Sequence, residues 1–172
     1  MLKRKVFVIA IVSVLGIASA GAQDSVAFID SQKILEAVPS YVSAKTEIDN
    51  LAKTYQQTIQ DELSKIETIY NNYQAAKASL TSAQRASMEN QIISKENAVQ
   101  QKQQLYFGED GVIPKKSEQL LDPIRKKLDA AIESVGKTYG YTMIIDVANA
   151  SNVAYYNEAK DISQVIINIL NN

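Results

Sequence analysis

The chain of 172 residues contains no cysteine, no histidine and no tryptophan. Without cysteine it forms no disulfide, so its stability has to come from packing or from assembly. The lack of both cysteine and histidine removes the usual ligands of zinc, copper and haem iron. No metal and no cofactor are therefore expected, although the composition leaves room for hard-metal sites made of carboxylates.

Glycine and proline are also scarce, with six and three residues respectively, and their positions are informative. The run from 41 to 107 contains neither, which favours one or more long helices. The stretch GEDG, residues 108–111, then interrupts a region of helix formers. Two glycines cost a continuous helix about 2 kcal/mol, so a break is expected there.

The N-terminus has the features of a secretory signal peptide. A basic segment, residues 3–5, precedes an uncharged apolar run from Val6 to Ala18, and small residues allow cleavage after Ala20 or Ala22. The apolar run is shorter than the roughly 20 residues of a spanning helix, although a retained membrane anchor is the alternative. Residues 1–22 are therefore expected to be removed on export, which places the mature protein in the periplasm.

Neither sign of charge dominates. Removing the three basic residues of the signal peptide leaves 15 basic and 19 acidic side chains, a net charge of −4. This balance is a poor match for general nucleic-acid binding. Residues 41–107 carry seven side chains of each sign and are neutral as a segment.

The periodicity predicts a mainly α fold with a small β component. Strands are expected over 25–30, 141–148 and 153–157, and short helices over 31–38, before Pro39, and from Asp161 onward. A long helix is expected from Ser40, as its cap, to Leu80, and an antiparallel partner begins at a Thr81 capping box. This helical hairpin, 41–111, is inserted into a small α/β body, 23–40 and 112–172.

Three segments in this order resemble the Skp/OmpH family of periplasmic chaperones: VAFIDSQKILEAVPSY, LLDPIRKKLDAAIESVGKTYGYTMIIDVAN, and VAYYN followed by KDISQVIINIL. The resemblance implies a homotrimer with a β-barrel-like body and three helical arms around a cavity. It further implies an ATP-independent holdase that binds unfolded outer-membrane proteins before insertion, with no enzymatic activity. The neutral arms differ from the basic arms of the family, so membrane-surface contact is expected to be weak. The alternative is a structural coiled-coil adaptor of the envelope that binds a folded partner.

The candidate site residues fall into three groups. Possible client contacts on the hairpin are Tyr55, Tyr70, Tyr73 and Met88, each of which packing on the partner helix would also explain. Gly108 and Gly111 form a possible hinge, and Glu109 with Asp110 reads as a solvated turn because calcium needs six or more oxygens. The residues expected in the core or the oligomer interface of the body are Val26, Phe28, Met143, Ile145, Val153, Tyr155, Val165 and Ile169.

Overall fold

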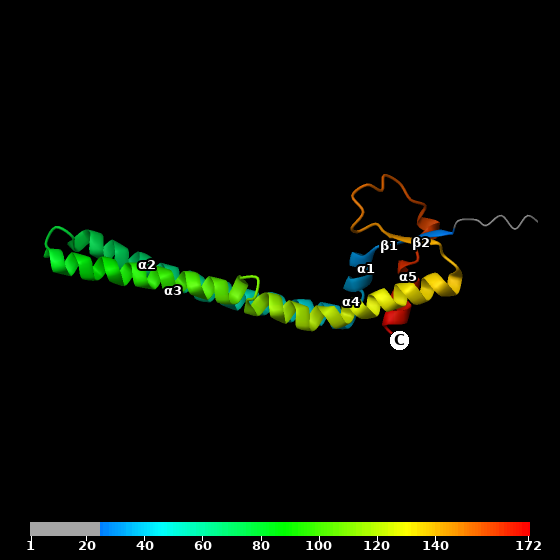
Figure 1. The fold of residues 1–172 in the computed structure, drawn as a ribbon, viewed down its shortest axis with the longest axis horizontal. Coiled ribbons are helices and arrows are strands. Elements are labelled where there is room, and N and C mark those ends of the chain that lie inside the picture. Colours follow the sequence, from blue (N-terminus) through cyan, green and yellow to red (C-terminus); the bar gives the residue numbers. More distant parts are fainter. Residues whose placement is uncertain (1–24) are drawn as a thin grey trace, which may run out of the picture.

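The computed structural model describes residues 25–172, and the predicted signal peptide lies outside this range. A long two-helix arm extends from a small body that contains the sheet and the C-terminal helix (Figure 1). The body uses both ends of the described chain, and the helices of the arm lie between them in the sequence. The fold is mainly α with a small β component, which confirms the expected class.

The sheet of the body has two parallel strands, β1 (Val26–Ile29) and β2 (Met143–Asp146), in the register Val26↔Met143 to Ile29↔Asp146. The strand predicted over 153–157 is wrong. This segment belongs to a loop that ends in a 3-10 turn, η1 (Glu158–Lys160), beyond which the Ile162 N–H donates to the Phe28 carbonyl at 2.9 Å. Its β-forming side chains find no strand partner within one chain, and unpaired backbone does not make a strand.

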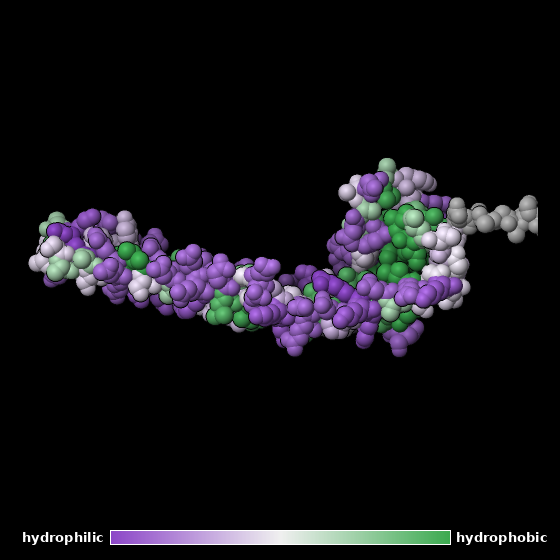
Figure 2. Space-filling view, in the orientation of Figure 1, coloured by the Kyte–Doolittle hydropathy of each residue, from purple (hydrophilic) through white to green (hydrophobic). Residues whose placement is uncertain are grey.

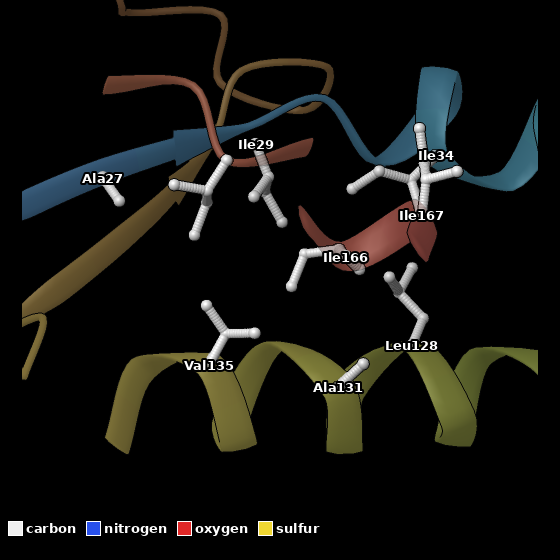
Figure 3. Packing of buried hydrophobic residues seen from close by; sticks show 9 residues of the cluster. Ala27, Ile29, Ile34, Leu128, Ala131, Val135, Ile166 and Ile167 are labelled. Atoms are coloured by element: carbon white, nitrogen blue, oxygen red, sulfur yellow. The ribbon is translucent and has the colours of Figure 1, made fainter. Parts of the chain in front are cut away.

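Two short helices flank the sheet. In α1 (Ser31–Glu36) the Asp30 carboxylate caps the first turn by accepting from the Lys33 N–H at 2.9 Å, and the helix ends earlier than predicted. The last helix, α5 (Ser163–Leu170), lies between the sheet and a long helix, α4 (Val112–Tyr139) (Figure 3). The buried core of the body consists of Ala27, Ile29, Ile34, Leu128, Ala131, Val135, Ile162, Ile166 and Ile167.

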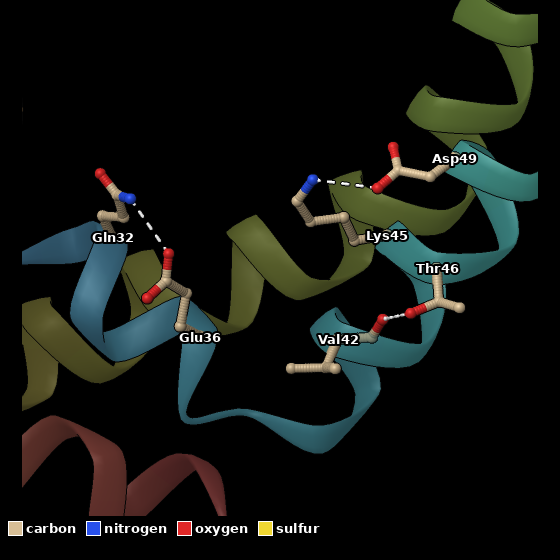
Figure 4. A network of polar contacts seen from close by, with 6 residues as sticks. All are labelled: Gln32, Glu36, Val42, Lys45, Thr46 and Asp49. Carbon is tan, nitrogen blue, oxygen red and sulfur yellow. Dashed lines mark hydrogen bonds and ion pairs between the residues drawn. The ribbon is translucent and has the colours of Figure 1, made fainter. Parts of the chain in front are cut away.

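The longest helix is α2 (Pro39–Ala76), which runs for 38 residues. Its start differs from the prediction, because Pro39 lies inside the first turn and Ser40 is not the cap. Proline suits this place since its fixed φ is helical and the first turn needs no N–H donor. Exposed contacts near the base, such as Lys45 with Asp49 at 3.1 Å and the Thr46 hydroxyl with the Val42 carbonyl at 2.8 Å, join residues four apart (Figure 4).

The returning side of the arm consists of two helices. The first, α3 (Ser82–Phe107), starts with the predicted Thr81–Gln84 capping box, and α4 follows after the GEDG break. Gly140 ends α4 with a φ of 68°, in the left-handed region that glycine adopts without strain. At 1.5 Å per residue α2 is about 57 Å long, so it spans the break and packs against both α3 and α4.

Candidate functional site

We call the part of the arm in which α2 packs against α3 the outer arm. A single narrow seam of buried side chains holds its two helices together. Ile59, Ile66 and Tyr73 of α2 are buried against Ile92 and Val99 of α3. Buried positions on α2 are spaced by eleven residues from Ile48 to Ile59 and by seven after that, so the buried stripe changes its phase once along the helix. A seam of this width leaves both flanks of the hairpin open to solvent.

The four candidate contact residues occupy different environments. Tyr73 is 3% exposed, and its hydroxyl donates to the Glu89 carboxylate across the seam. Tyr55 stacks on Tyr106 with 4.0 Å between ring centroids, and Met88 packs against the seam. Tyr70 alone of the four is largely exposed, at 48%. In this conformation the arm presents Tyr70 to solvent, whereas the ring of Tyr73 is used for packing.

Further apolar side chains of the arm are exposed. The sequence places Leu63 in the stripe of the first helix, but it is 41% exposed and lies beside the seam. The narrow two-helix contact explains this difference, because it covers one side-chain row per helix rather than a wide face. The other exposed large apolar residues of the outer arm are Ile93, Leu105 and Phe107.

Polar contacts close the tip of the arm. The Arg85 guanidinium donates to the Lys77 carbonyl at 3.2 Å and to the Leu80 carbonyl at 3.0 Å. These carbonyls follow the end of α2, where the helix supplies no partner of its own. The Lys77 ammonium lies 5.4 Å from the centre of the Tyr73 ring. Arg85 is a tip residue that the sequence analysis did not single out, because its acceptors are backbone groups brought close by the turn.

The eight residues expected in the body core or interface do not form the buried core of the chain. In β1, Ala27 and Ile29 face that core, while Val26 and Phe28 lie on the opposite face with their register partners Met143 and Ile145. Only one of the eight, Val165, packs against the core. Three of the eight are exposed in the single chain: Met143 at 57%, Tyr155 at 85% and Ile169 at 46%.

The second face of the sheet is therefore apolar, with Val26, Phe28 and Ile145 half-buried and Met143 exposed within the single chain. The Phe28 ring packs on the loop that follows β2, with 5.1 Å between its centroid and that of Tyr156. Hydrophobic side chains also gather visibly over the body, in contrast to a mostly hydrophilic arm (Figure 2). Apolar surface of this kind on a small body is typical of an interaction site.

The GEDG break is compact. The Gly111 N–H donates to the Gly108 carbonyl at 2.8 Å, and both glycines have negative φ angles. Glycine is required here by close approach. A Cβ at Gly108 would lie 2.5 Å from the Gln104 carbonyl oxygen, and one at Gly111 would lie 2.8 Å from the Gly108 carbonyl oxygen.

Comparison with known proteins identifies the family to which this chain belongs. The family model "Outer membrane protein (OmpH-like)" matches residues 25–170. The chain belongs to the OmpH-like family. A solved structure from Caulobacter crescentus CB15, described as that of a candidate outer membrane chaperone (OmpH-like), is similar to it with a TM-score of 0.64 and 17% identity, over 87% of this chain and 85% of that one. A comparison with curated protein sequences gave no significant match.

Membership of the OmpH-like family supports a general role as a periplasmic chaperone of outer-membrane proteins. The described residues of this OmpH-like chain contain no group of three or more acidic side chains placed to hold a metal ion. Nor do the helices of residues 25–172 include one long and apolar enough to cross a bilayer.

Proposed function

We propose that the mature protein is an ATP-independent holdase of the periplasm, in which a homotrimer encloses unfolded outer-membrane proteins between its arms. Export follows from the predicted signal peptide, with cleavage after Ala20 or Ala22. The observation that carries the proposal is the pairing of a partly exposed apolar face on the body with a projecting, thinly packed arm. Each feature supports one part of the function.

The apolar face supports assembly. It is formed by Val26, Phe28, Met143 and Ile145, and the exposed Tyr155 lies on the loop that follows β2. Burying such side chains gains roughly 25 cal/mol per Å² of apolar area. A small body buries a smaller fraction of its surface in its own core than a large domain does, so burial between copies adds to its stability. Three copies that share this face would point their arms in one direction.

The arm supports capture without sequence specificity. Tyr70, Leu63 and Ile93 offer apolar contact between polar side chains on a surface that is neutral overall. Apolar contact is non-directional, so many different unfolded segments satisfy it. The described arm carries no catalytic constellation, so binding and release are the activities it can provide.

A direct test dilutes a urea-unfolded outer-membrane β-barrel protein into buffer with the purified mature protein. Turbidity should stay low at one trimer for each client, with no nucleotide present. The matched control lacks residues 59–103, with Thr58 joined to Gln104 through a short glycine linker, so that the body is retained without the outer arm. This control should fail to prevent aggregation, and unchanged aggregation with the full-length mature protein would contradict the proposal.

Crosslinking in intact cells separates the holdase from the adaptor. A holdase should be linked to many unrelated β-barrel proteins. One dominant, folded partner would instead favour a structural adaptor of the envelope.

A further inference from the structure

The charges of the outer arm are divided between its two flanks. A groove between α2 and α3 is lined by Lys65, Lys95 and Lys102, with Glu62 as the single acidic side chain among them. Glu62 is already paired with Lys102 across the helices. Lys65 and Lys95 thus remain as two exposed positive charges, which we call the lysine flank.

The opposite flank is negative. Each residue of a helix is rotated by about 100° from the last, so Lys65 and Glu67, on either side of the buried Ile66, point to opposite flanks. Lys95 and Glu96 lie four and three residues before the buried Val99. At 100° per residue these two positions fall on opposite sides of Val99, so Glu96 lies on the flank away from Lys95. We call Glu67 and Glu96, both exposed, the glutamate flank.

The four charged residues have no partner within one arm. None of them takes part in the ion pairs found among residues 25–172. The glutamate flank also carries apolar side chains, since Tyr70 follows Ile66 by four residues and is 48% exposed. An unpaired positive flank and an unpaired negative flank with exposed apolar groups are complementary surfaces.

The two flanks also lie at the same height along the arm. Lys65 and Glu67 differ by two residues, about 3 Å along the helix axis, and Lys95 and Glu96 differ by one. A rotation about an axis parallel to the arms moves a residue around the axis without changing its height. Cyclic symmetry of this kind brings different surfaces of neighbouring copies together, so the lysine flank of one arm meets the glutamate flank of the next in register.

We propose that, in the empty oligomer, the lysine flank of each arm docks against the glutamate flank of the neighbouring copy. This inference rests on the proposed oligomeric holdase. Docking covers the exposed apolar side chains of the arm when no client is bound, with the aliphatic stems of the lysines lying over them. A client then has to separate the arms, so the same apolar groups serve first the arm–arm contact and then the client.

The lack of cysteine makes the test simple. A spin label on Ala78→Cys, an exposed position in the tip turn, reports the distances between tips within the oligomer by pulsed electron resonance. Raising the salt to about 1 M shortens the screening length to about 3 Å and should shift the distances to larger values. The double variant Lys65→Glu/Lys95→Glu should produce the same shift at low salt.

The charge swap is the decisive comparison in this experiment. Adding Glu67→Lys/Glu96→Lys to the first pair restores complementarity with the polarity reversed, and should return the short distances. Lys53→Glu/Lys115→Glu makes the same change in net charge at exposed sites outside the groove and should have no effect. If the lysine variant folds poorly by circular dichroism, Glu67→Lys/Glu96→Lys alone should open the arms instead.

The outcomes are distinguishable from those of the parent proposal. Light scattering that shows a monomer would remove the proposed assembly itself. An intact oligomer whose tip distances respond neither to salt nor to charge reversal would overturn the docking inference while leaving the holdase untouched. Loss of short distances in the lysine variant without recovery in the charge swap would also overturn it.

Discussion

At the scale of single residues, Asp146 joins the end of β2 to the start of α1. Its carboxylate accepts from the Ser31 N–H at 3.0 Å, the Ser31 hydroxyl at 2.6 Å and the Asn149 amide at 2.6 Å. Burial raises the pKa of Asp146, but the hydrogen bonds from Ser31 and Asn149, with one from the Ala148 N–H, together lower it below its usual value. The ionised form is therefore the one that the fold stabilises.

Replacing Asp146 with Asn should lower the free energy of unfolding at pH 7 by about 1–3 kcal/mol, because a charged acceptor of several donors is lost. Since the folded-state pKa is depressed, this contribution is present above the unfolded value near 3.8 and disappears as the pH falls through the lower folded value. Urea unfolding at pH 7 and at pH 3 measures both effects. Asp129→Asn, at an exposed site on α4, is the control, and equal stability of the two variants would contradict this role.

Tyr70 and Tyr73 lie in one turn of α2 and should behave differently. Tyr73→Ala removes a ring that is 3% exposed and should cost about 2–5 kcal/mol of arm stability. Tyr70→Ser removes a ring that is 48% exposed and should leave thermal unfolding unchanged while weakening client capture. Thermal circular dichroism and the aggregation assay separate the two effects. Full capture by a stable Tyr70→Ser protein would exclude Tyr70 as a contact.

At the scale of elements, the GEDG break divides the returning side of the arm while α2 continues past it. We propose that it is a hinge, held by the Gly108 N–H donating to the Gln104 carbonyl at 2.9 Å and by the Gly111 turn. Alanine has a higher helix propensity than glycine, so glycine-to-alanine changes at the break should stiffen the arm. The close contact of a Cβ with Gln104 shows that they have to displace the backbone as well.

Gly108→Ala should therefore remodel the break, which hydrogen exchange detects as faster exchange of the backbone amides at positions 108 and 111. Gly136→Ala is the matched control within α4. A Cβ there meets only the Ile144 side chain at 3.4 Å, so this change should be neutral or stabilising by up to about 1 kcal/mol. Unchanged exchange and unchanged client capacity in Gly108→Ala would mean that the break is only a tolerated insertion.

The elements also show which sequence signals are dependable. The Thr81 capping box and the GEDG break are local signals, because each acts through backbone groups a few residues away, and each is found where the sequence predicts it. Pro39 was read as a stop but begins α2, since the same missing N–H suits a helix start as well as a helix end. Residues 153–157 have a strand-like pattern, yet a strand needs a partner that this chain alone does not offer.

At the scale of the whole molecule, assembly should depend on the body and not on the arm. The variant that lacks residues 59–103 keeps the apolar face and the core of the body, so light scattering should give the same number of copies as for the intact protein. Thr58 and Gln104 are suitable ends for the linker, because the stacked pair Tyr55 and Tyr106 is retained and keeps the two helices side by side next to the deletion. A monomer after this deletion would place the assembly contacts in the arms.

The contrasting variant charges the apolar face. Phe28→Asp in an otherwise intact chain should dissociate the oligomer, because a buried unpaired charge costs several kcal/mol at an interface. Its core stays intact in the single chain, since Phe28 lies on the face away from that core. Helical content by circular dichroism should thus be retained while the mass falls, and an unchanged mass would exclude this face as the interface.

The sequence by itself determined the class of fold, the capping box that begins α3 and the place of the break, because helix periodicity, caps and glycines act over short distances. Only the tertiary structure decided which apolar residues are buried. Leu63 and Tyr70 fit the helical stripe but are exposed, because a two-helix contact covers a single row, and Val26 and Phe28 fit a core strand but face away from the core. The division of charge between two flanks likewise arises only when the two helices of the arm are placed side by side.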